Sequence, residues 1–251
     1  MITKTAIVTT TINIPTFLED ICSNAKKYEH KLVSFIVIGD KKTPPEIYKF
    51  CDDLNKKYGY LVEYYDLNRQ EDRLKSYSDL LSIIPYNSGA RKLLGNLIAY
   101  QDGYDTVIQI DDDNFIGESD FISEHNSVGI TKNLKLFKSN DSWHNIYSEL
   151  IEENNIPFFP RGFPWGKRDY NLSSKSEIVN DYKKIVLING LVFEDPDIDA
   201  ISRLFWPIRV VGTKENINEN FGLYPGTWSS FNNQNTSTCR ELTSVYFTPV
   251  C

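Results

Sequence analysis

Short apolar runs rich in β-branched residues recur along the first half of the chain and predict β-strands. They cover residues 5–10, 32–38, 60–65 and 106–110. Segments with helical spacing of apolar residues separate them. This alternation is typical of βαβ units around a mostly parallel central sheet. The pattern therefore predicts an α/β fold with helices on both sides of the sheet.

Three helices are expected between these strands. The first should begin near Pro15, and its apolar face consists of Phe17, Leu18, Ile21 and Ala25. The second should begin at Pro44 and Pro45, because a missing N–H costs nothing in the first turn of a helix. The third covers residues 88–100, with Ser88 as its cap.

Arg91 and Lys92 lie in the first turn of the third helix. Cations at this end oppose the helix dipole, and they favour an anion bound there. The alternative is that both side chains point into solvent. The sequence leaves these two readings open.

The second half of the chain has a less regular pattern. Residues 139–184 are rich in aromatic residues, Pro and Asn and show no sustained period, which predicts loops of an active site. Strand character returns at residues 185–193 and near 208–211. We find no linker, and expect one domain over residues 1–251 with halves of about 1–115 and 116–251.

Composition narrows the class of protein. With 251 residues, 41% hydrophobic and 24% charged, the chain can bury one substantial core. The net charge of −7 argues against broad binding of nucleic-acid phosphates. No run of 18 apolar residues and no signal peptide is present, so we expect a cytoplasmic protein without a membrane span.

Cysteine and histidine patterns predict neither disulfides nor zinc. The four cysteines are widely spaced and form no CxxC pair, which fits reduced thiols. The three histidines form no HExxH pattern. Any metal is therefore expected to have oxygen ligands.

An aspartate run, Asp111, Asp112 and Asp113, directly follows the strand at 106–110. Open α/β sheets bind ligands at the carboxyl ends of their strands. Alternation places Asp111 and Asp113 on one side, where two carboxylates can hold Mg²⁺ or Mn²⁺ together with diphosphate oxygens. A calcium-binding EF-hand is excluded, because Ile116 and Ile122 stand where its Gly and Glu are needed. Taken without the preceding strand, such a triplet is more often structural.

Further acidic and aromatic candidates lie in the second half. Asp197 and Asp199 have the spacing to face one pocket, where one could act as general base toward an acceptor hydroxyl. Asp-Pro-Asp is equally a common turn and cap sequence. Aromatic side chains of the same region could stack on a sugar or base, or simply pack; they are Phe163, Trp165 and Trp206.

Five scattered motifs together resemble the reversibly glycosylated polypeptides. They are IVIGDKKTP (residues 36–44), SGARKLLGNLIAYQDG (88–103), IQIDDDN (108–114), FPRGFPWGKR (159–168) and DPDIDAISRL (195–204). That family includes the UDP-arabinopyranose mutases, and the STELLO-type glycosyltransferases are relatives. The resemblance implies a Rossmann-like GT-A nucleotide-sugar-binding fold, a UDP-sugar donor and a divalent metal.

Carried over by motif, the resemblance places Mn²⁺ or Mg²⁺ and the diphosphate on residues 111–113. Asp112 is expected to face the ribose or the scaffold. The nucleoside is expected near Thr9, Thr10 and Asp40, and Arg91 is expected to meet the diphosphate. The first half, about 1–115, would thus bind the nucleotide, and the second half, 116–251, the sugar and acceptor.

Two arginines reproduce the spacing of a mutase motif. In the mutases, an RG[YF]P motif carries the arginine that becomes glycosylated, and a second arginine follows seven residues later. Arg161 and Arg168 match this spacing. A guanidinium stays protonated and has no free lone pair, so an electrostatic role beside the leaving diphosphate suits Arg161 better than nucleophilic attack. A surface loop with structural hydrogen bonds is the alternative for both.

The resemblance therefore leads to one expected function and two alternatives. The first is a metal-dependent glycosyltransferase that passes a sugar from UDP to an unknown sugar, glycan or protein acceptor. The second is a mutase, in which UDP recaptures the sugar through another ring oxygen. The third is a non-catalytic or self-glycosylated partner subunit, because the mutases continue beyond the segment where this chain ends at Cys251. Mutase relatives assemble, so a homo-oligomer is compatible with the resemblance.

Overall fold

Two compact units make up the protein. In the computed structural model, which describes residues 3–170, 176–214, 220–243 and 245, unit 1 is built from residues 1–130, 185–188 and 233–251. Unit 2 is built from residues 131–184 and 189–232. The chain thus crosses between the units several times, and the division does not separate two consecutive halves.

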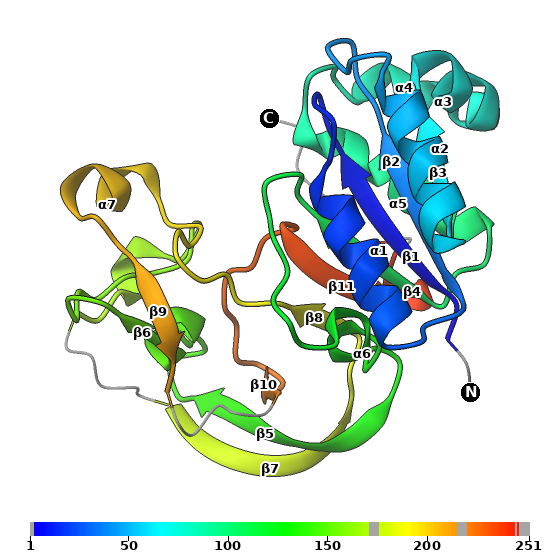
Figure 1. The fold of residues 1–251 in the computed structure, drawn as a ribbon. Coiled ribbons are helices and arrows are strands. Elements are labelled where there is room, and N and C mark those ends of the chain that lie inside the picture. The colour runs from blue at the N-terminus through cyan, green and yellow to red at the C-terminus, as the bar shows by residue number, and fades with distance from the viewer. Residues whose placement is uncertain (1–2, 171–175, 215–219, 244, 246–251) are drawn as a thin grey trace. The chain divides into compact units, whose positions relative to one another are not determined.

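A six-stranded mixed sheet forms the centre of unit 1 (Figure 1). Its strand order is β3-β2-β1-β4-β11-β8. The strands are β1 (Thr5–Thr10), β2 (Val33–Ile38), β3 (Leu61–Tyr65), β4 (Thr106–Ile110), β8 (Leu187–Asn189) and β11 (Asn235–Cys239). The first four are parallel, and β11 pairs with β4 in the antiparallel direction.

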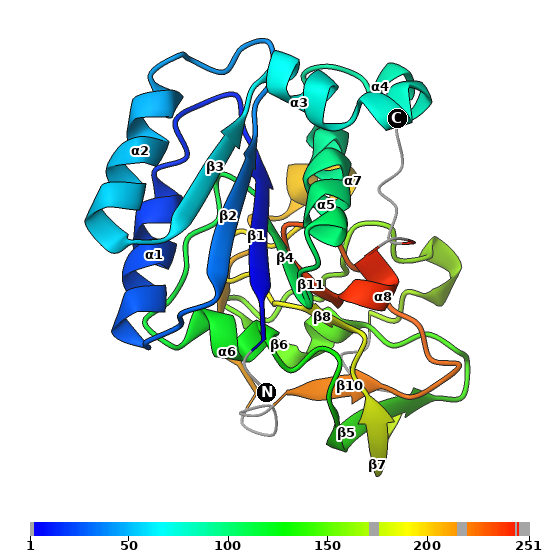
Figure 2. The same ribbon diagram turned by 90° about the vertical axis from the view of Figure 1, so that its right-hand side faces the viewer.

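Helices cover both faces of this sheet (Figure 2). The longer ones are α1 (Phe17–Lys27), α2 (Ile47–Tyr58) and α5 (Lys92–Gln101). The shorter ones are α3 (Leu67–Arg73), η1 (Lys75–Tyr77), α4 (Ser78–Ile83), η2 (Gly89–Arg91), α6 (Phe121–His125) and α8 (Arg240–Thr243). Helices α1 and α2 lie on one face and α5 on the other, so the core strands are apolar on both sides.

Alternation along β1 shows how this burial works. Ile7 packs with α1 and α2, whereas its neighbours Ala6 and Val8 pack with α5. Gly95 brings α5 close to β1, because a Cβ at this position would overlap the Val8 side chain. The sheet is therefore the middle of three layers, with helices packed on both of its faces.

The predicted α/β class and parallel strands are confirmed. Strands β1 and β4 have the predicted bounds, and β2 and β3 begin one residue later than expected. The predicted apolar face of α1 is buried in full. Ser88 caps the predicted third helix by accepting a hydrogen bond from the Ala90 amide, and a 3₁₀ turn precedes α5.

Unit 2 consists of small sheets. A three-stranded sheet has the order β10-β5-β7, with bounds β5 (Thr131–Ser139), β7 (Ser176–Lys184) and β10 (Phe221–Leu223). An antiparallel pair joins β6 (Leu150–Glu152) and β9 (Val210–Thr213). The remaining short elements are η3 (Ile146–Glu149), η4 (Trp165–Lys167) and α7 (Ala200–Phe205). A separate apolar core that includes Tyr147, Phe158 and Val210 holds them together.

The prediction of loops throughout residues 139–184 was wrong in part. Strand β7 pairs with β5 over nine residues. Its sequence, SEIVNDYKK, is mostly polar, and no residue of the strand is fully buried. Hydrophobic alternation is therefore too weak to reveal it.

The described cysteines Cys22, Cys51 and Cys239 are all buried, and the thiols of Cys22 and Cys51 are free. Burial raises the pKa of the Cys22 and Cys51 thiols to about 12, so both stay protonated. Cys251 lies outside the described residues. In the described part of the chain, no helix is both long and apolar enough to cross a membrane.

Candidate functional site

The carboxyl ends of β1, β2 and β4 carry the polar residues of unit 1. Strand β1 lies between β2 and β4, so consecutive connections leave it in opposite directions. Open α/β sheets bind ligands outside the strand ends at such a switch point. Thr11 follows β1, Asp40 follows β2 and Asp111 follows β4. The sequence thus places a polar residue at each of these three ends.

The aspartate run forms a tight turn at the end of β4. The Asp111 amide donates to the Gln234 carbonyl at 3.0 Å, and the Asn114 amide donates to the Asp111 carbonyl at 3.3 Å. Asp113 is exposed, whereas Asp111 and Asp112 are half-buried. The turn therefore separates the three carboxylates into different surroundings.

Asp111 forms an ion pair with Lys92, the first residue of α5. The Lys92 side chain is only 1% exposed, and its ammonium also donates to the Asn233 carbonyl at 3.0 Å. A buried ammonium requires such partners. Lys92 therefore does not point into solvent, and it neutralises one carboxylate of the run.

Asp112 faces the scaffold. Its carboxylate accepts a hydrogen bond of 2.5 Å from the buried Thr11 hydroxyl. The Thr11 carbonyl in turn accepts a hydrogen bond of 2.7 Å from the Thr43 hydroxyl. This contact ties the end of β4 to the end of β1, across the switch point.

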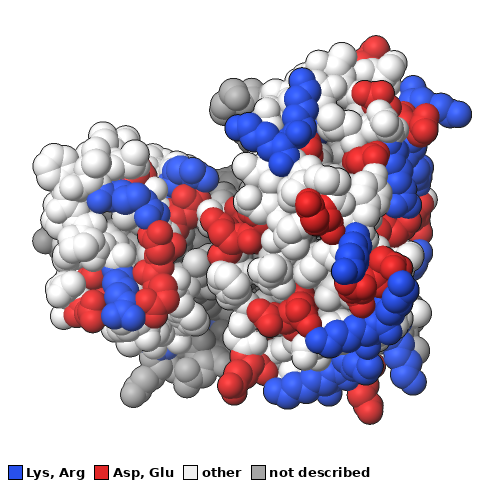
Figure 3. Space-filling view, turned by 45° about the horizontal axis from the view of Figure 1, so that its top comes forward, with Lys and Arg blue, Asp and Glu red and all other residues white. Residues whose placement is uncertain are grey.

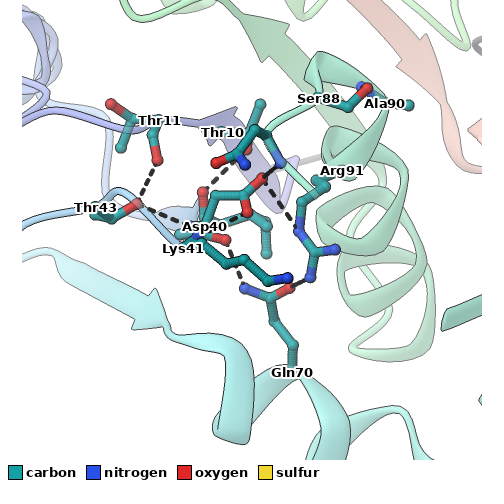
Figure 4. A network of polar contacts seen from close by, with 12 residues as sticks. Thr10, Thr11, Asp40, Lys41, Thr43, Gln70, Ser88, Ala90 and Arg91 are labelled. Carbon is teal, nitrogen blue, oxygen red and sulfur yellow. Dashed lines mark hydrogen bonds and ion pairs between the residues drawn. The ribbon is translucent and has the colours of Figure 1, made fainter. Parts of the chain in front are cut away.

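Asp40 and Arg91 lie in one buried network (Figure 4). The Asp40 carboxylate accepts hydrogen bonds from the amides of Lys41, at 2.7 Å, and Asn87, at 2.6 Å. Arg91 Nε lies 3.7 Å from the same carboxylate. The Arg91 guanidinium also donates to Gln70 Oε1. These contacts join the end of β2 to the start of α5.

Gln70 anchors the other side of this network. Its amide donates to the carbonyls of Gly39, at 2.8 Å, and Tyr65, at 2.7 Å, beside the ends of β2 and β3. Burial lowers the pKa of Arg91, and the charge of Asp40 opposes this effect. The expectation that Arg91 points into solvent is thus excluded. Its contact with a diphosphate stays a prediction, because protein partners surround the guanidinium.

Thr9 and Thr10 occupy the last two positions of β1. The Thr10 hydroxyl donates to the Ile38 carbonyl at 3.0 Å. The Thr9 hydroxyl is buried and has no hydrogen-bond partner among the described residues. Thr11 rather than these two contacts the aspartate run.

The aspartate run suits a metal that is shared with a ligand. Within the part of the chain that is described, no three His, Cys, Asp or Glu side chains form a ready metal site. Mg²⁺ commonly takes only one or two carboxylates and completes its shell with waters and substrate phosphates. Asp113 is exposed, and Asp111 is paired with one ammonium. Asp111 and Asp113 therefore supply the number of carboxylates that such a metal needs, and their joint binding of one ion stays a prediction.

The four candidates in unit 2 form two arginine–aspartate pairs. Arg161 is 65% exposed, and its guanidinium lies 3.1 Å from the Asp197 carboxylate. The Asn232 amide also donates to Asp197, at 3.0 Å. Arg161 thus keeps most of its side chain accessible while its position is fixed at one end.

Arg168 is buried instead, with 2% of its side chain exposed. Its guanidinium lies 2.9 Å from Asp199 and 3.6 Å from the Trp165 ring centroid. Asp199 caps α7 by accepting hydrogen bonds from the Ser202 amide and hydroxyl. Burial would raise the pKa of Asp199, but the Ser202 and Arg168 contacts outweigh it and lower the pKa. The interpretation of Asp199 as a helix cap therefore agrees with its contacts.

The aromatic candidates of unit 2 differ in exposure. Phe163 is buried, whereas Trp165 and Trp206 are exposed. Phe163 is therefore a packing residue, which was one of the two interpretations of the aromatic residues. Trp165 keeps an accessible surface even though Arg168 stacks on its ring.

Sequence reasoning missed two residues of the unit 1 site, Thr11 and Gln70, and it missed the partner of Lys92. Lys92 was recognised as a cation at a helix start, but its pairing with Asp111 depends on how α5 packs beside β4. Gln70 lies in a short polar helix with no distinguishing motif. Thr11 is the one with a local signal, because it directly follows a strand end.

Charges of both signs lie side by side on the face shown in Figure 3. The sequence matches no protein-family model, and no curated protein matches it.

Proposed function

We propose that the protein is a metal-dependent glycosyltransferase that takes its sugar from a nucleotide sugar, with UDP as the nucleotide. The observation that carries this proposal is the gathering of carboxylates and cations at the ends of β1, β2 and β4. The four parallel strands have the order 3-2-1-4 that is found in nucleotide-binding α/β sheets. The five motifs that resemble the reversibly glycosylated polypeptides support a GT-A fold.

In this proposal each residue of the aspartate run has its own task. Asp113 and Asp111 hold Mn²⁺ or Mg²⁺, which supplies Lewis-acid neutralisation of the diphosphate. Asp112, fixed by Thr11, keeps the turn in place. Lys92 holds Asp111 before ligands bind and adds a positive charge near the departing diphosphate.

The nucleoside is assigned to the β1 and β2 ends. The Asp40 carboxylate is fixed there by two amides and Arg91, which keeps its orientation constant. Lys41 lies over the Tyr86 ring at 3.8 Å, beside this network. Tyr86 is 44% exposed, and the Arg91 guanidinium also lies 4.9 Å from its ring centroid, so both cations hold this ring beside the Asp40 network.

The mutase is the second candidate, and one observation favours it. Arg161, at the position that the resemblance marks as glycosylated, is the exposed member of the two arginines. Its cationic guanidinium still favours an electrostatic role. Product analysis separates the two candidates, because only a mutase converts UDP-arabinopyranose to its furanose isomer without an acceptor.

The test is turnover of a panel of UDP-sugars with Mn²⁺, followed by chromatography of UDP and sugar products. Asp113→Asn should lower turnover on the order of 100-fold, because it removes a metal ligand. Glu118→Gln, in the same exposed loop, is the matched control and should keep wild-type turnover. Absence of turnover with every donor would leave the non-catalytic partner subunit as the better account, and unchanged turnover in Asp113→Asn would contradict the metal site at the aspartate run.

A further inference from the structure

Unit 2 contains a cavity of about 180 Å³ that is lined by residues of this unit alone. Part of its wall is aromatic and consists of Trp143, Tyr147, Phe158, Phe159 and Phe163. Neither the proposed metal site nor the nucleotide site includes any of these residues. The cavity is thus a separate feature of the fold.

The aromatic rings hold each other in place. Trp143 contacts Phe163 edge-on, with ring centroids 5.5 Å apart. Phe159 lies 5.4 Å from Phe163, and Tyr147 lies 5.2 Å from Phe158. Rings fixed in this way keep a binding surface preformed, so little entropy is lost when a ligand binds.

A fixed loop brings a polar side chain to the same cavity. The buried Glu152 carboxylate accepts hydrogen bonds from the amides of Asn154, at 2.8 Å, and Ile156, at 2.7 Å. Between them, Asn155 lines the cavity with a positive φ of 57°. In the described part of the chain, the backbone amide of Asn155 donates to the Glu152 carbonyl at 3.2 Å, whereas its side-chain amide has no hydrogen-bond partner. Its donor and acceptor are therefore available to a ligand.

Charges around the cavity nearly cancel. The charged residues of the lining are two lysines, Lys167 and Lys214, and three acidic residues, Asp141, Asp169 and Glu152. His144 also lines it, but burial and the nearby Lys214 lower the pKa of this residue to about 4, so it is neutral at pH 7. The two ammoniums and three carboxylates nearly balance, so the lining gives no net attraction to an anion and only a weak one to a cation.

Size limits the ligand further. The volume of the cavity is about 180 Å³. Pockets for larger ligands begin at about 300 Å³. A nucleotide is thus too large, whereas a single sugar ring, with its apolar C–H face and its hydroxyl edge, suits aromatic walls beside an amide.

We propose that this cavity binds one neutral monosaccharide unit through its aromatic wall and Asn155, and that this unit belongs to the acceptor. The assignment to the acceptor rests on the proposed function, whereas the binding of a neutral sugar does not. Lys214 and Asn155 hydrogen-bond to the sugar hydroxyls.

The test is a ligand-observed NMR titration of the whole protein with arabinose, xylose, glucose, galactose and mannose, and with glucose 6-phosphate as the anionic comparison. At least one neutral sugar should bind saturably and more tightly than glucose 6-phosphate. Asn155→Gly suits the positive φ and removes the amide, so it should raise the Kd about five- to tenfold without unfolding the loop. Lys214→Ala should have a similar effect.

Asn154→Ala, at the neighbouring exposed position, is the control and should bind sugar as the wild type does. The proposal is overturned if none of the neutral sugars binds, if glucose 6-phosphate binds more tightly, or if both Asn155→Gly and Lys214→Ala leave the Kd unchanged. UDP and Mn²⁺ are titrated separately. If a sugar binds and UDP does not, the proposed function is refuted and the sugar site is not. If UDP binds and no neutral sugar does, only the proposed sugar site is refuted.

Discussion

The Thr11 hydroxyl and the Asp112 carboxylate form a hydrogen bond of 2.5 Å that joins the ends of β1 and β4. The two residues are 101 positions apart in the chain, and both follow parallel strands. Hydrogen bonds to charged groups are about twice as strong as those between neutral groups. The contact therefore fixes the turn that carries Asp111 and Asp113.

We predict energetic coupling between these two residues. In a double-mutant cycle of Thr11→Val and Asp112→Asn, the coupling free energy of unfolding should be about 1–2 kcal/mol, as for a hydrogen bond to a charged group. Urea denaturation of the four proteins measures it. Additive effects of the two substitutions would show that the contact contributes nothing to stability.

Lys92 should compete with a metal for Asp111. Lys92→Met keeps the apolar stem but removes the ammonium, so the protein without ligands should lose about 1–3 kcal/mol of stability. Mn²⁺ with UDP should then raise the melting temperature of the variant more than that of the wild type, because the metal no longer displaces a cation.

The control for Lys92 is the double variant Lys92→Met/Asp111→Asn, which removes both charges of the pair. It should recover part of the stability lost by Lys92→Met alone, and it should gain less from Mn²⁺ with UDP. Equal thermal shifts in the wild type and in Lys92→Met would mean that the ammonium and the metal do not compete.

Arg91 offers a test of its predicted contact with the diphosphate. Because it is buried between Asp40 and Gln70, Arg91→Met should cost about 3 kcal/mol of stability, and Arg91→Lys should not restore it fully. If Arg91 also meets the diphosphate, Arg91→Lys should lose affinity for UDP more than for uridine. Calorimetry with both ligands decides this, and an equal loss for both assigns Arg91 a positioning role only.

His125 should make unit 1 sensitive to acid. Burial lowers its pKa to about 4, although a hydrogen bond with Asn235 opposes the shift. An unfolded histidine titrates near 6.5, so the unfolded chain takes up a proton first as the pH falls. The contribution of His125 to stability is therefore complete above about pH 6.5 and is lost between 6.5 and about 4.

Denaturation of the wild type and His125→Gln at several pH values between 7 and 4.5 measures this effect. The stability of the wild type should fall more steeply, by up to about 1.4 kcal/mol per pH unit. His144 titrates in both proteins and does not affect the comparison. Parallel curves would mean that His125 is not buried in its neutral form.

The elements and contacts that could be predicted from the sequence are those that depend on neighbouring residues in the chain. The strands β1 and β4 were predictable because each is apolar on both faces and has polar residues at its end. Strand β7 was not, because most of its side chains are polar and none is fully buried. The Asp111–Asp113 turn was found from its strand, whereas its partners Thr11 and Lys92 depend on packing between distant segments.

The same limit applies to unit 2. Arg161 and Arg168 are seven residues apart, as in the mutase motif, but this spacing does not predict whether either side chain is exposed. The structure shows one arginine at the surface and one beneath Trp165. The pairing of each with one aspartate likewise follows from the fold of residues 160–199 rather than from any repeat in the sequence.

A crystal structure with UDP and Mn²⁺, in which anomalous scattering locates the metal, tests the central claim most directly. The account predicts one Mn²⁺ coordinated by the carboxylates of Asp111 and Asp113, with Lys92 released from Asp111. The diphosphate should complete the shell of the metal at the ends of β1 and β4. A metal bound elsewhere, or UDP bound away from these strand ends, would contradict the account.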